Sequence, residues 1–198
     1  MAAFDEGEFY ARGVCNNFYD DTYPVVGPMI HEDKDLQQRV RDTIGGKRVI
    51  ELGCCNSVRY CLDFFAMGAG SYVGVEPFHP PTAQEVRQLL VQAKRTEREI
   101  SYIHRDAASY LQSVTAGLGL VTFSSGLLER SILHNLDYAR EVVHEIVRLA
   151  SPNVSSAIHV TDPFFSDLLK REGLHLDFGR EISPNGFLVG IYSKAQAK

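Results

Sequence analysis

Two short apolar runs, each followed by a turn residue, constrain the fold of this chain most strongly. The run from Lys47 to Leu52 opens onto Gly53, which is typical of a buried parallel strand entering a tight turn. A second run begins at Tyr72 and ends at Glu76, immediately before Pro77, which stops the strand. A strand, a turn, a helix and a second strand ending in a carboxylate predict the nucleoside-binding half of an open α/β sheet.

The turn after the first run does not suit a dinucleotide. Nicotinamide and flavin dinucleotides need the pattern G-x-G-x-x-G, so that the pyrophosphate can lie against a bare helix N-terminus. Here the three glycine positions are occupied by Gly53, Cys55 and Val58. A pyrophosphate would therefore meet a cysteine side chain and a β-branched residue. The phosphate-binding pattern G-K-[ST] occurs nowhere in the chain.

The segment from Val49 to Cys54 resembles the first motif of class I S-adenosylmethionine-dependent methyltransferases. In that family the strand ends in an acid, followed by Gly-x-Gly-x-Gly. Glu51 matches the acid and Gly53 the first glycine, while Cys55 and Ser57 stand at the second and third glycine positions. Both replacements are small, so a cofactor can still approach the backbone closely. The resemblance implies S-adenosylmethionine as the cofactor and S-adenosylhomocysteine as its product.

The resemblance covers residues 45 to 193 and implies further cofactor contacts. Glu76 falls where the family places its ribose-binding acid, with Pro77 beside it. Asp106, followed by Ala107, matches the acid that lies beside the adenine amino group. Ser124 stands near the end of the expected fourth strand, which in this fold faces the transferred methyl group.

The remaining elements complete the same architecture. A fourth strand is expected at 118–125, a fifth at 157–160, and two further strands at 173–179 and 186–194. Between the fourth and fifth strands, the apolar positions of an amphipathic helix recur at three- and four-residue steps. These positions are Leu136, Ala139, Val142, Val143, Ile146, Val147 and Ala150. The expected fold is a single, doubly wound, mostly parallel α/β sheet with helices on both faces and a C-terminal antiparallel hairpin.

Residues 1 to 46 precede the first strand and are rich in aromatic side chains. We predict that they form a lid or cap, and that residues 47 to 194 form the S-adenosylmethionine-binding methyltransferase domain. Tyr10 and Tyr19 are the leading cofactor contacts, because cation–π attraction favours a sulfonium beside aromatic faces. Packing of these rings on the sheet edge is an open alternative. A helix is expected from Leu36 to Ile44.

Candidate catalytic side chains follow the fourth strand. Arg130 and His134 could bind a carboxylate or act as a general base, and His31 and His104 are further candidate bases. The alternative for each is an ordinary solvated side chain. The segment Ser124–Leu128 replaces the [DNS]-P-P-[YFW] motif of families that methylate adenine or amide nitrogens. This difference argues against nucleic-acid bases and glutamine amides as substrates.

Composition narrows the partners. With 198 residues, of which 44% are hydrophobic, the chain can form one domain with a sizeable core. A net charge of −5 argues against DNA or bulk RNA as a substrate. No apolar stretch approaches the roughly 20 residues needed to span a bilayer, so no membrane partner is expected. The acidic start is unlike a signal peptide, and a cytoplasmic location is therefore expected. Without a C-x-x-C or a grouped histidine motif, no metal site is expected.

The expected function is S-adenosylmethionine-dependent methyl transfer to an oxygen, nitrogen or sulfur atom of a small molecule. Two alternatives stay open. Cys55 and Ser57 leave room for a protein that binds S-adenosylmethionine without transferring methyl. The acidic, aromatic N-terminal segment could instead hold a basic peptide, as a protein or peptide methyltransferase would. A homodimer is also compatible with the sequence.

Overall fold

The computed structural model describes residues 33–54, 59–77, 81–117, 119–128, 135–150, 156–181 and 186–194. The helices in these ranges are α3 (Lys34–Ile44), α4 (Arg59–Ala66), α5 (Ala83–Ala93), α6 (Ala107–Ser113), α7 (Leu136–Leu149) and α8 (Pro163–Arg171). The strands are β1 (Arg48–Leu52), β2 (Ser71–Val75), β3 (Ile100–Ile103), β4 (Leu120–Leu128), β5 (Ser156–Thr161), β6 (Leu174–Glu181) and β7 (Leu188–Lys194). In this part of the chain, no helix has the length and apolarity to cross a membrane.

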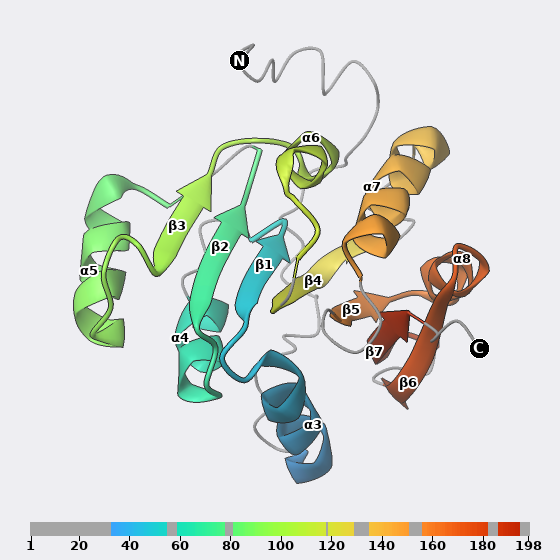
Figure 1. The fold of residues 1–198 in the computed structure, drawn as a ribbon, viewed down its shortest axis with the longest axis horizontal. Coiled ribbons are helices and arrows are strands. Elements are labelled where there is room, and N and C mark those ends of the chain that lie inside the picture. Colours follow the sequence, from blue (N-terminus) through green and yellow to red (C-terminus); the bar gives the residue numbers. More distant parts are fainter. Residues whose placement is uncertain are drawn as a thin grey trace.

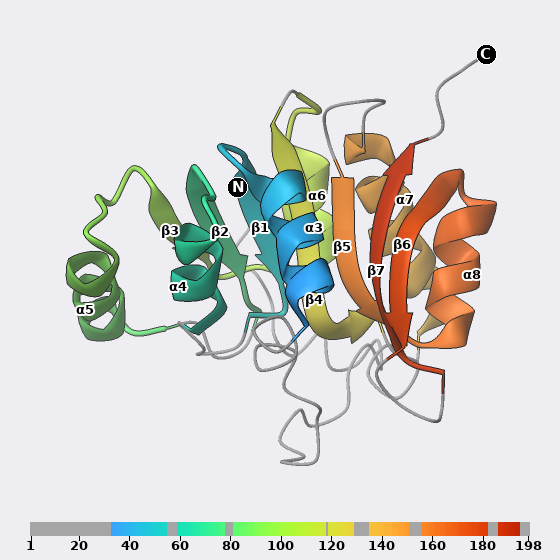
Figure 2. The same ribbon diagram turned by 90° about the horizontal axis from the view of Figure 1, so that it is seen from below.

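The strands form one sheet in the order β3-β2-β1-β4-β5-β7-β6. Strands β1 to β5 pair in parallel, whereas β7 pairs antiparallel with both β5 and β6. Helices α3, α4 and α5 cover one face, and α6, α7 and α8 cover the other (Figures 1 and 2). The expected doubly wound sheet with a C-terminal antiparallel hairpin is confirmed. The strand order reverses between β1 and β4, where sheets of this kind bind ligands.

Helix α3 is part of the packed domain. Its residues Leu36, Val40 and Ile44 are fully buried, so the expected helix is confirmed and begins two residues earlier than expected. Residues 33–46 of the predicted cap segment therefore contribute to the core. Residues 1–32 lie outside the described residues.

A charged cluster holds α3 against the edge strand β6. Asp33 caps α3 by accepting from the backbone N–H of Leu36, and Arg180 Nε lies 2.6 Å from Asp33 Oδ2. The guanidinium of Arg39 lies 4.6 Å from the centre of the Phe178 ring. This contact is favourable because an aromatic face attracts a cation. The first described helix is thereby attached to the C-terminal hairpin.

Helix α7 confirms the expected apolar stripe except in its first turn. Asn135 caps the helix by accepting from the backbone N–H groups of Asp137 and Tyr138. Leu136 was expected on the buried face but is 45% exposed, because the cap places it at the first helical position, facing outward. Tyr138, which a purely apolar pattern omits, is 2% exposed and packs in the core instead.

Arg148 joins the end of α6 to α7. One terminal nitrogen lies 2.7 Å from the carbonyl oxygen of Leu111 and 3.0 Å from that of Val114, and Nε lies 2.5 Å from Glu145 Oε2. Because a helix leaves its last carbonyls without intrahelical partners, these bonds satisfy the end of α6.

Replacing Arg148 by alanine should lower the free energy of unfolding by about 1 to 3 kcal/mol, since charge-assisted bonds to partly buried carbonyls are lost. Urea denaturation measures this change. The matched control is Arg140→Ala, which removes an exposed pair with Asp137 on the same helix and should cost under about 0.5 kcal/mol. Equal losses in the two variants would contradict the proposed capping role.

Candidate functional site

The candidate site lies at the carboxyl ends of β1, β2 and β3, beside the reversal of strand order. Gly53 turns the chain out of β1 with a φ of +70°, and its N–H donates to the carbonyl of Val75 at 2.9 Å. A side chain at Gly53 would meet nothing closer than 3.6 Å. The left-handed backbone, rather than lack of space, therefore accounts for glycine here.

Glu51 is a buried carboxyl group with one satisfied and one unsatisfied oxygen. The Tyr72 hydroxyl donates to Oε2, while Oε1 is buried and has no hydrogen-bond partner among the described residues. Burial raises the pKa of Glu51 to about 8; the bond from Tyr72 opposes this rise, and the neighbouring charge of Glu76 adds to it. The carboxyl group is therefore mostly protonated at neutral pH.

Gly74 of β2, which lies opposite Glu51, leaves room for the side chains of Tyr102 and Cys54 beside the carboxyl group. Gly74 pairs with Glu51, and a Cβ at Gly74 would lie 2.5 Å from the Tyr102 ring and 2.8 Å from Cys54 Sγ. Burial raises the pKa of the Tyr102 hydroxyl and of the Cys61 thiol, so both are uncharged. Glu51 thus lies among groups that do not neutralise a negative charge.

Glu76 and Pro77 follow β2 directly. The backbone N–H of Glu76 donates to the carbonyl of Ile103 at 3.0 Å, and the Glu76 side chain is buried. His104 Nε2 lies 2.7 Å from the carbonyl oxygen of Pro77. Since a carbonyl only accepts, His104 carries a hydrogen on Nε2. This candidate base therefore connects the loops that follow β2 and β3.

Asp106 and Ala107 begin α6 directly after β3. Asp106 caps the helix, and its Oδ1 accepts from the Ser109 N–H at 3.0 Å and from the Tyr138 hydroxyl at 3.1 Å. Both Asp106 and Ala107 are buried. The structure therefore brings Glu51, Gly53, Glu76, Asp106 and their neighbours to one edge of the sheet.

Ser124 has a different environment from the one expected. Strand β4 continues to Leu128, where it still pairs with Thr161 of β5 after a shift of register between Ser124 and Leu128. The expected strand end at 125 is therefore wrong. Ser124 is fully buried within the strand, with Oγ 2.8 Å from His159 Nδ1. His159 Nε2 lies 3.1 Å from Thr122 Oγ1. Burial lowers the pKa of His159 to about 3, so this imidazole is neutral.

The other predicted site residues lie outside the described residues; they are Tyr10, Tyr19, His31, Cys55, Ser57, Arg130 and His134. Their roles stay predictions. Across the ranges that the structure describes, no three His, Cys, Asp or Glu side chains gather in a way that could hold a metal ion.

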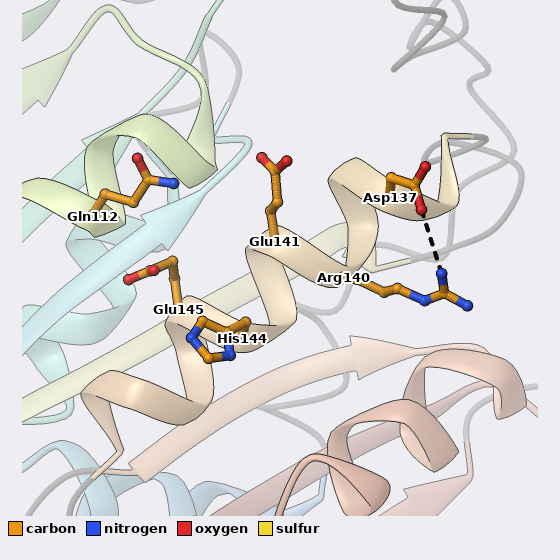
Figure 3. Close-up of a pocket in the computed structure, with 6 residues that line it drawn as sticks. All are labelled: Gln112, Asp137, Arg140, Glu141, His144 and Glu145. Atoms are coloured by element: carbon orange, nitrogen blue, oxygen red, sulfur yellow. Dashed lines mark hydrogen bonds and ion pairs between the residues drawn. The ribbon is translucent and has the colours of Figure 1, made fainter.

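A surface hollow of about 300 Å³ lies between α6 and α7 (Figure 3). Its lining residues are Gln112 of α6 and Asp137, Arg140, Glu141, His144 and Glu145 of α7. None of them belongs to a strand end or to the loops after β1, β2 and β3. Figure 3 shows Asp137 paired with Arg140 at one end of the hollow. We assign this hollow no part in the site.

Sequence reasoning missed three residues that shape the site. Tyr72 and Tyr138 supply hydroxyls to the carboxyl groups of Glu51 and Asp106, and Gly74 makes room beside Glu51. The only available signal was Gly74, since glycine inside a buried strand often marks a close approach of other groups.

Neither a protein-family model nor a curated protein matches the chain. Solved structures do match. Mitomycin 7-O-methyltransferase matches with a TM-score of 0.55 and 13% identity over 87% of this chain and 61% of its own. An O-methyltransferase from neocarzinostatin biosynthesis was solved with S-adenosylmethionine and 2-hydroxy-5-methyl naphthoic acid. It matches with a TM-score of 0.56 and 10% identity over 86% of this chain and 55% of its own. A Pyrococcus horikoshii protein described as an RNA methyltransferase matches with a TM-score of 0.55 and 16% identity over 97% of this chain and 100% of its own.

The fold is that of the class I methyltransferases. The resemblance read from the first motif is thus confirmed at the level of the fold. This chain spans the full length of the P. horikoshii protein but less than two thirds of either O-methyltransferase. In this chain, Glu51, Glu76 and Asp106 lie at the carboxyl ends of the strands on one side of the point where the strand order reverses. Open α/β sheets bind their ligands beside that point.

Proposed function

We propose that this protein is an S-adenosylmethionine-dependent methyltransferase that acts on a small molecule. The observation that carries the proposal is a row of three carboxyl groups at the ends of adjacent strands. Glu51 of β1, Glu76 after β2 and Asp106 after β3 are 1%, 4% and 8% exposed. Buried carboxyl groups are costly unless donors reach them, so such a row is suited to a ligand rich in donors.

The donors of S-adenosylmethionine suit these acceptors in kind and number. Its ammonium group fits the unsatisfied, buried Oε1 of Glu51. Its two ribose hydroxyls fit Glu76, and its adenine amino group fits Asp106. A dinucleotide fits less well, because its pyrophosphate would bring negative charge to a site that already holds three carboxyl groups.

When bound, the cofactor supplies an electrophilic methyl group on its sulfonium. The protein's own contribution is to orient the acceptor and to exclude water around it. The turn at Gly53 lets the backbone approach the ligand closely. His159 is too deeply buried to deprotonate a substrate. Arg130, His134 and His31 remain the proposed catalytic side chains. Of the predicted cap segment, residues 1–46, the part that lies outside the described residues, 1–32, remains the proposed cover.

A small-molecule acceptor is supported by the net charge of −5, because nucleic-acid binding draws most of its affinity from neutralised phosphates. The neocarzinostatin O-methyltransferase, which shares the fold, was solved with a naphthoic acid. The P. horikoshii protein is described as an RNA methyltransferase. RNA is therefore included among the test substrates.

Calorimetry tests the cofactor. S-adenosylhomocysteine should bind in the micromolar range, and nicotinamide dinucleotides far more weakly. Glu76→Ala should cost about 2 kcal/mol of binding, or roughly 30-fold in Kd, because charge-assisted hydrogen bonds are lost. The exposed Glu97→Ala variant is the matched control and should bind like the wild type. Tighter binding of the dinucleotide would refute the assignment.

Transfer is tested separately. The protein, S-adenosylmethionine and a mixture of small phenols, amines and acids should yield S-adenosylhomocysteine above the Glu76→Ala background. Parallel reactions with bulk tRNA and with a basic peptide distinguish the other substrate classes. Saturable cofactor binding with no turnover in any of these reactions would favour the alternative of a binding protein without methyl transfer.

A further inference from the structure

We propose that Tyr138, in the first turn of α7, is a positioning residue that sets the preference of the site for adenine by fixing the carboxylate of Asp106. The inference rests on the proposed function, because it assigns a role within the same cofactor site. It concerns a side chain that lies 32 residues away from Asp106 in the chain.

The direction of the hydrogen bond between the two side chains follows from the backbone beside them. The Tyr138 hydroxyl lies 3.4 Å from the backbone nitrogen of Ala108 and 3.1 Å from Asp106 Oδ1. The N–H of Ala108 can only donate, so the hydroxyl oxygen accepts there. Its own hydrogen is then directed to the carboxylate. Asp106 is thus held by a group whose orientation is itself fixed.

Only one oxygen of Asp106 is used in this way. Oδ1 accepts both from the Tyr138 hydroxyl and from the backbone N–H of Ser109, at 3.0 Å. No hydrogen bond from the described residues reaches Oδ2, and Asp106 keeps a small exposed surface. Two donors on Oδ1 fix the plane of the carboxylate. Oδ2 is therefore the oxygen presented to a ligand.

A fixed carboxylate oxygen distinguishes purines by the group at position 6. The amino group of adenine donates to Oδ2, whereas the oxo group of hypoxanthine would bring a second acceptor against it. Sites that hydrogen-bond a ligand group reject analogues that cannot reciprocate, because their own polar atoms are then left unpaired. If the carboxylate could turn away, this penalty would be relieved. The Tyr138 hydroxyl prevents that rotation.

The backbone and the ring of Tyr138 are both held in place, so its hydroxyl keeps a fixed position beside Asp106. The Asn135 side chain accepts from the backbone N–H of Tyr138 at 3.0 Å, which fixes the first turn of α7. The ring packs in the core that joins α6 to α7, where phenylalanine would fill the same space. The structural alternative is that the hydroxyl serves only to satisfy the Ala108 N–H.

Calorimetry with two ligands tests the inference on the full chain. S-adenosylhomocysteine and S-inosylhomocysteine share every group except those at the edge of the purine. The first has an amino group at position 6 and a bare N1, and the second has an oxo group at position 6 and a hydrogen on N1. The wild type should prefer the adenosyl compound, and Tyr138→Phe should reduce that preference about tenfold, with little change in affinity for the inosyl compound. Asp106→Asn should reduce the preference further, because its amide can donate to the oxo group. Tyr110→Phe, a buried tyrosine of α6, is the matched control and should keep the wild-type preference.

The outcomes separate this inference from the proposed function. If the wild type does not bind S-adenosylhomocysteine, the proposed function fails and the inference fails with it. If the wild type binds and Tyr138→Phe keeps its preference, only the inference is overturned. An equal loss of affinity for both ligands would make Tyr138 purely structural and would also overturn it. Thermal melts establish that each variant is folded before its affinities are compared.

Discussion

Without added cofactor, the stability of the protein should fall as the pH rises from about 4.5 to about 8, and Glu51→Gln should lack this part of the fall. The pKa of Glu51 is raised to about 8 in the folded state and is near 4.5 when the chain is unfolded. Between about pH 4.5 and about pH 8 the folded state therefore binds one proton more than the unfolded state. The stabilisation from this proton is fully present below about pH 4.5 and is lost as the pH rises through about 8. The free energy of unfolding falls by up to about 1.4 kcal/mol per pH unit in this interval, or by several kcal/mol over the whole of it.

Urea unfolding of both proteins, from about pH 5 to about pH 9, isolates this effect. Glutamine imitates the neutral acid, so the free energy of unfolding of the variant relative to the wild type should rise with pH and then level off. A difference that does not change with pH would show that Glu51 is ionised in the folded protein. Under the proposed function, an ammonium group reaching Oε1 should favour the ionised form. Cofactor binding near neutral pH should then release a proton, which calorimetry in buffers of different ionisation enthalpy detects.

Replacing Phe64 by alanine should lower the free energy of unfolding by about 3 to 5 kcal/mol. Phe64 lies on the side of α4 that faces the sheet and is fully buried. Its ring meets Phe123 edge-on at 4.8 Å between centroids and stacks with Tyr72 at 6.4 Å. The substitution would leave a cavity beside the tyrosine that donates to Glu51.

The adjacent Phe65 provides the matched control in chemical denaturation. It is half-buried, and the guanidinium of Arg95 lies 4.7 Å from the centre of its ring. Phe65→Ala should cost about 1 to 2 kcal/mol, because the ring keeps contact with water and loses mainly a partly exposed cation–π contact. Equal losses at the two positions would contradict the arrangement of α4 on the sheet.

The architecture could be predicted because its determinants are local and repeated. The apolar runs that became β1 and β2 end in turn residues, and the periodicity of α7 identifies its buried stripe. The end of β4 could not be predicted, since the register shift between Ser124 and Leu128 depends on pairing with β5. Leu136 was misplaced for a similar reason, because the cap at Asn135 rather than the apolar pattern sets the first turn of α7.

The candidate site was only partly predictable. Acidic residues that directly follow apolar runs, such as Glu76 and Asp106, can be recognised because parallel strands bring their carboxyl ends to one edge. Their hydrogen-bond partners cannot be recognised, since the tyrosines that reach Glu51 and Asp106 come from other elements. Burial, which controls the protonation of Glu51, is likewise a property of the assembled layers.

The position of β7 has a consequence for how the chain is made. Although β7 comes after β6 in sequence and is the last of the described strands, it lies between β5 and β6 in the sheet. During synthesis β5 therefore keeps an unpaired edge until residues 188–194 have left the ribosome. Unpaired edges are the surfaces on which incomplete chains associate. We expect the nascent chain to depend most on chaperones in this interval, and early termination of translation within β7 to yield aggregated rather than shortened, folded protein.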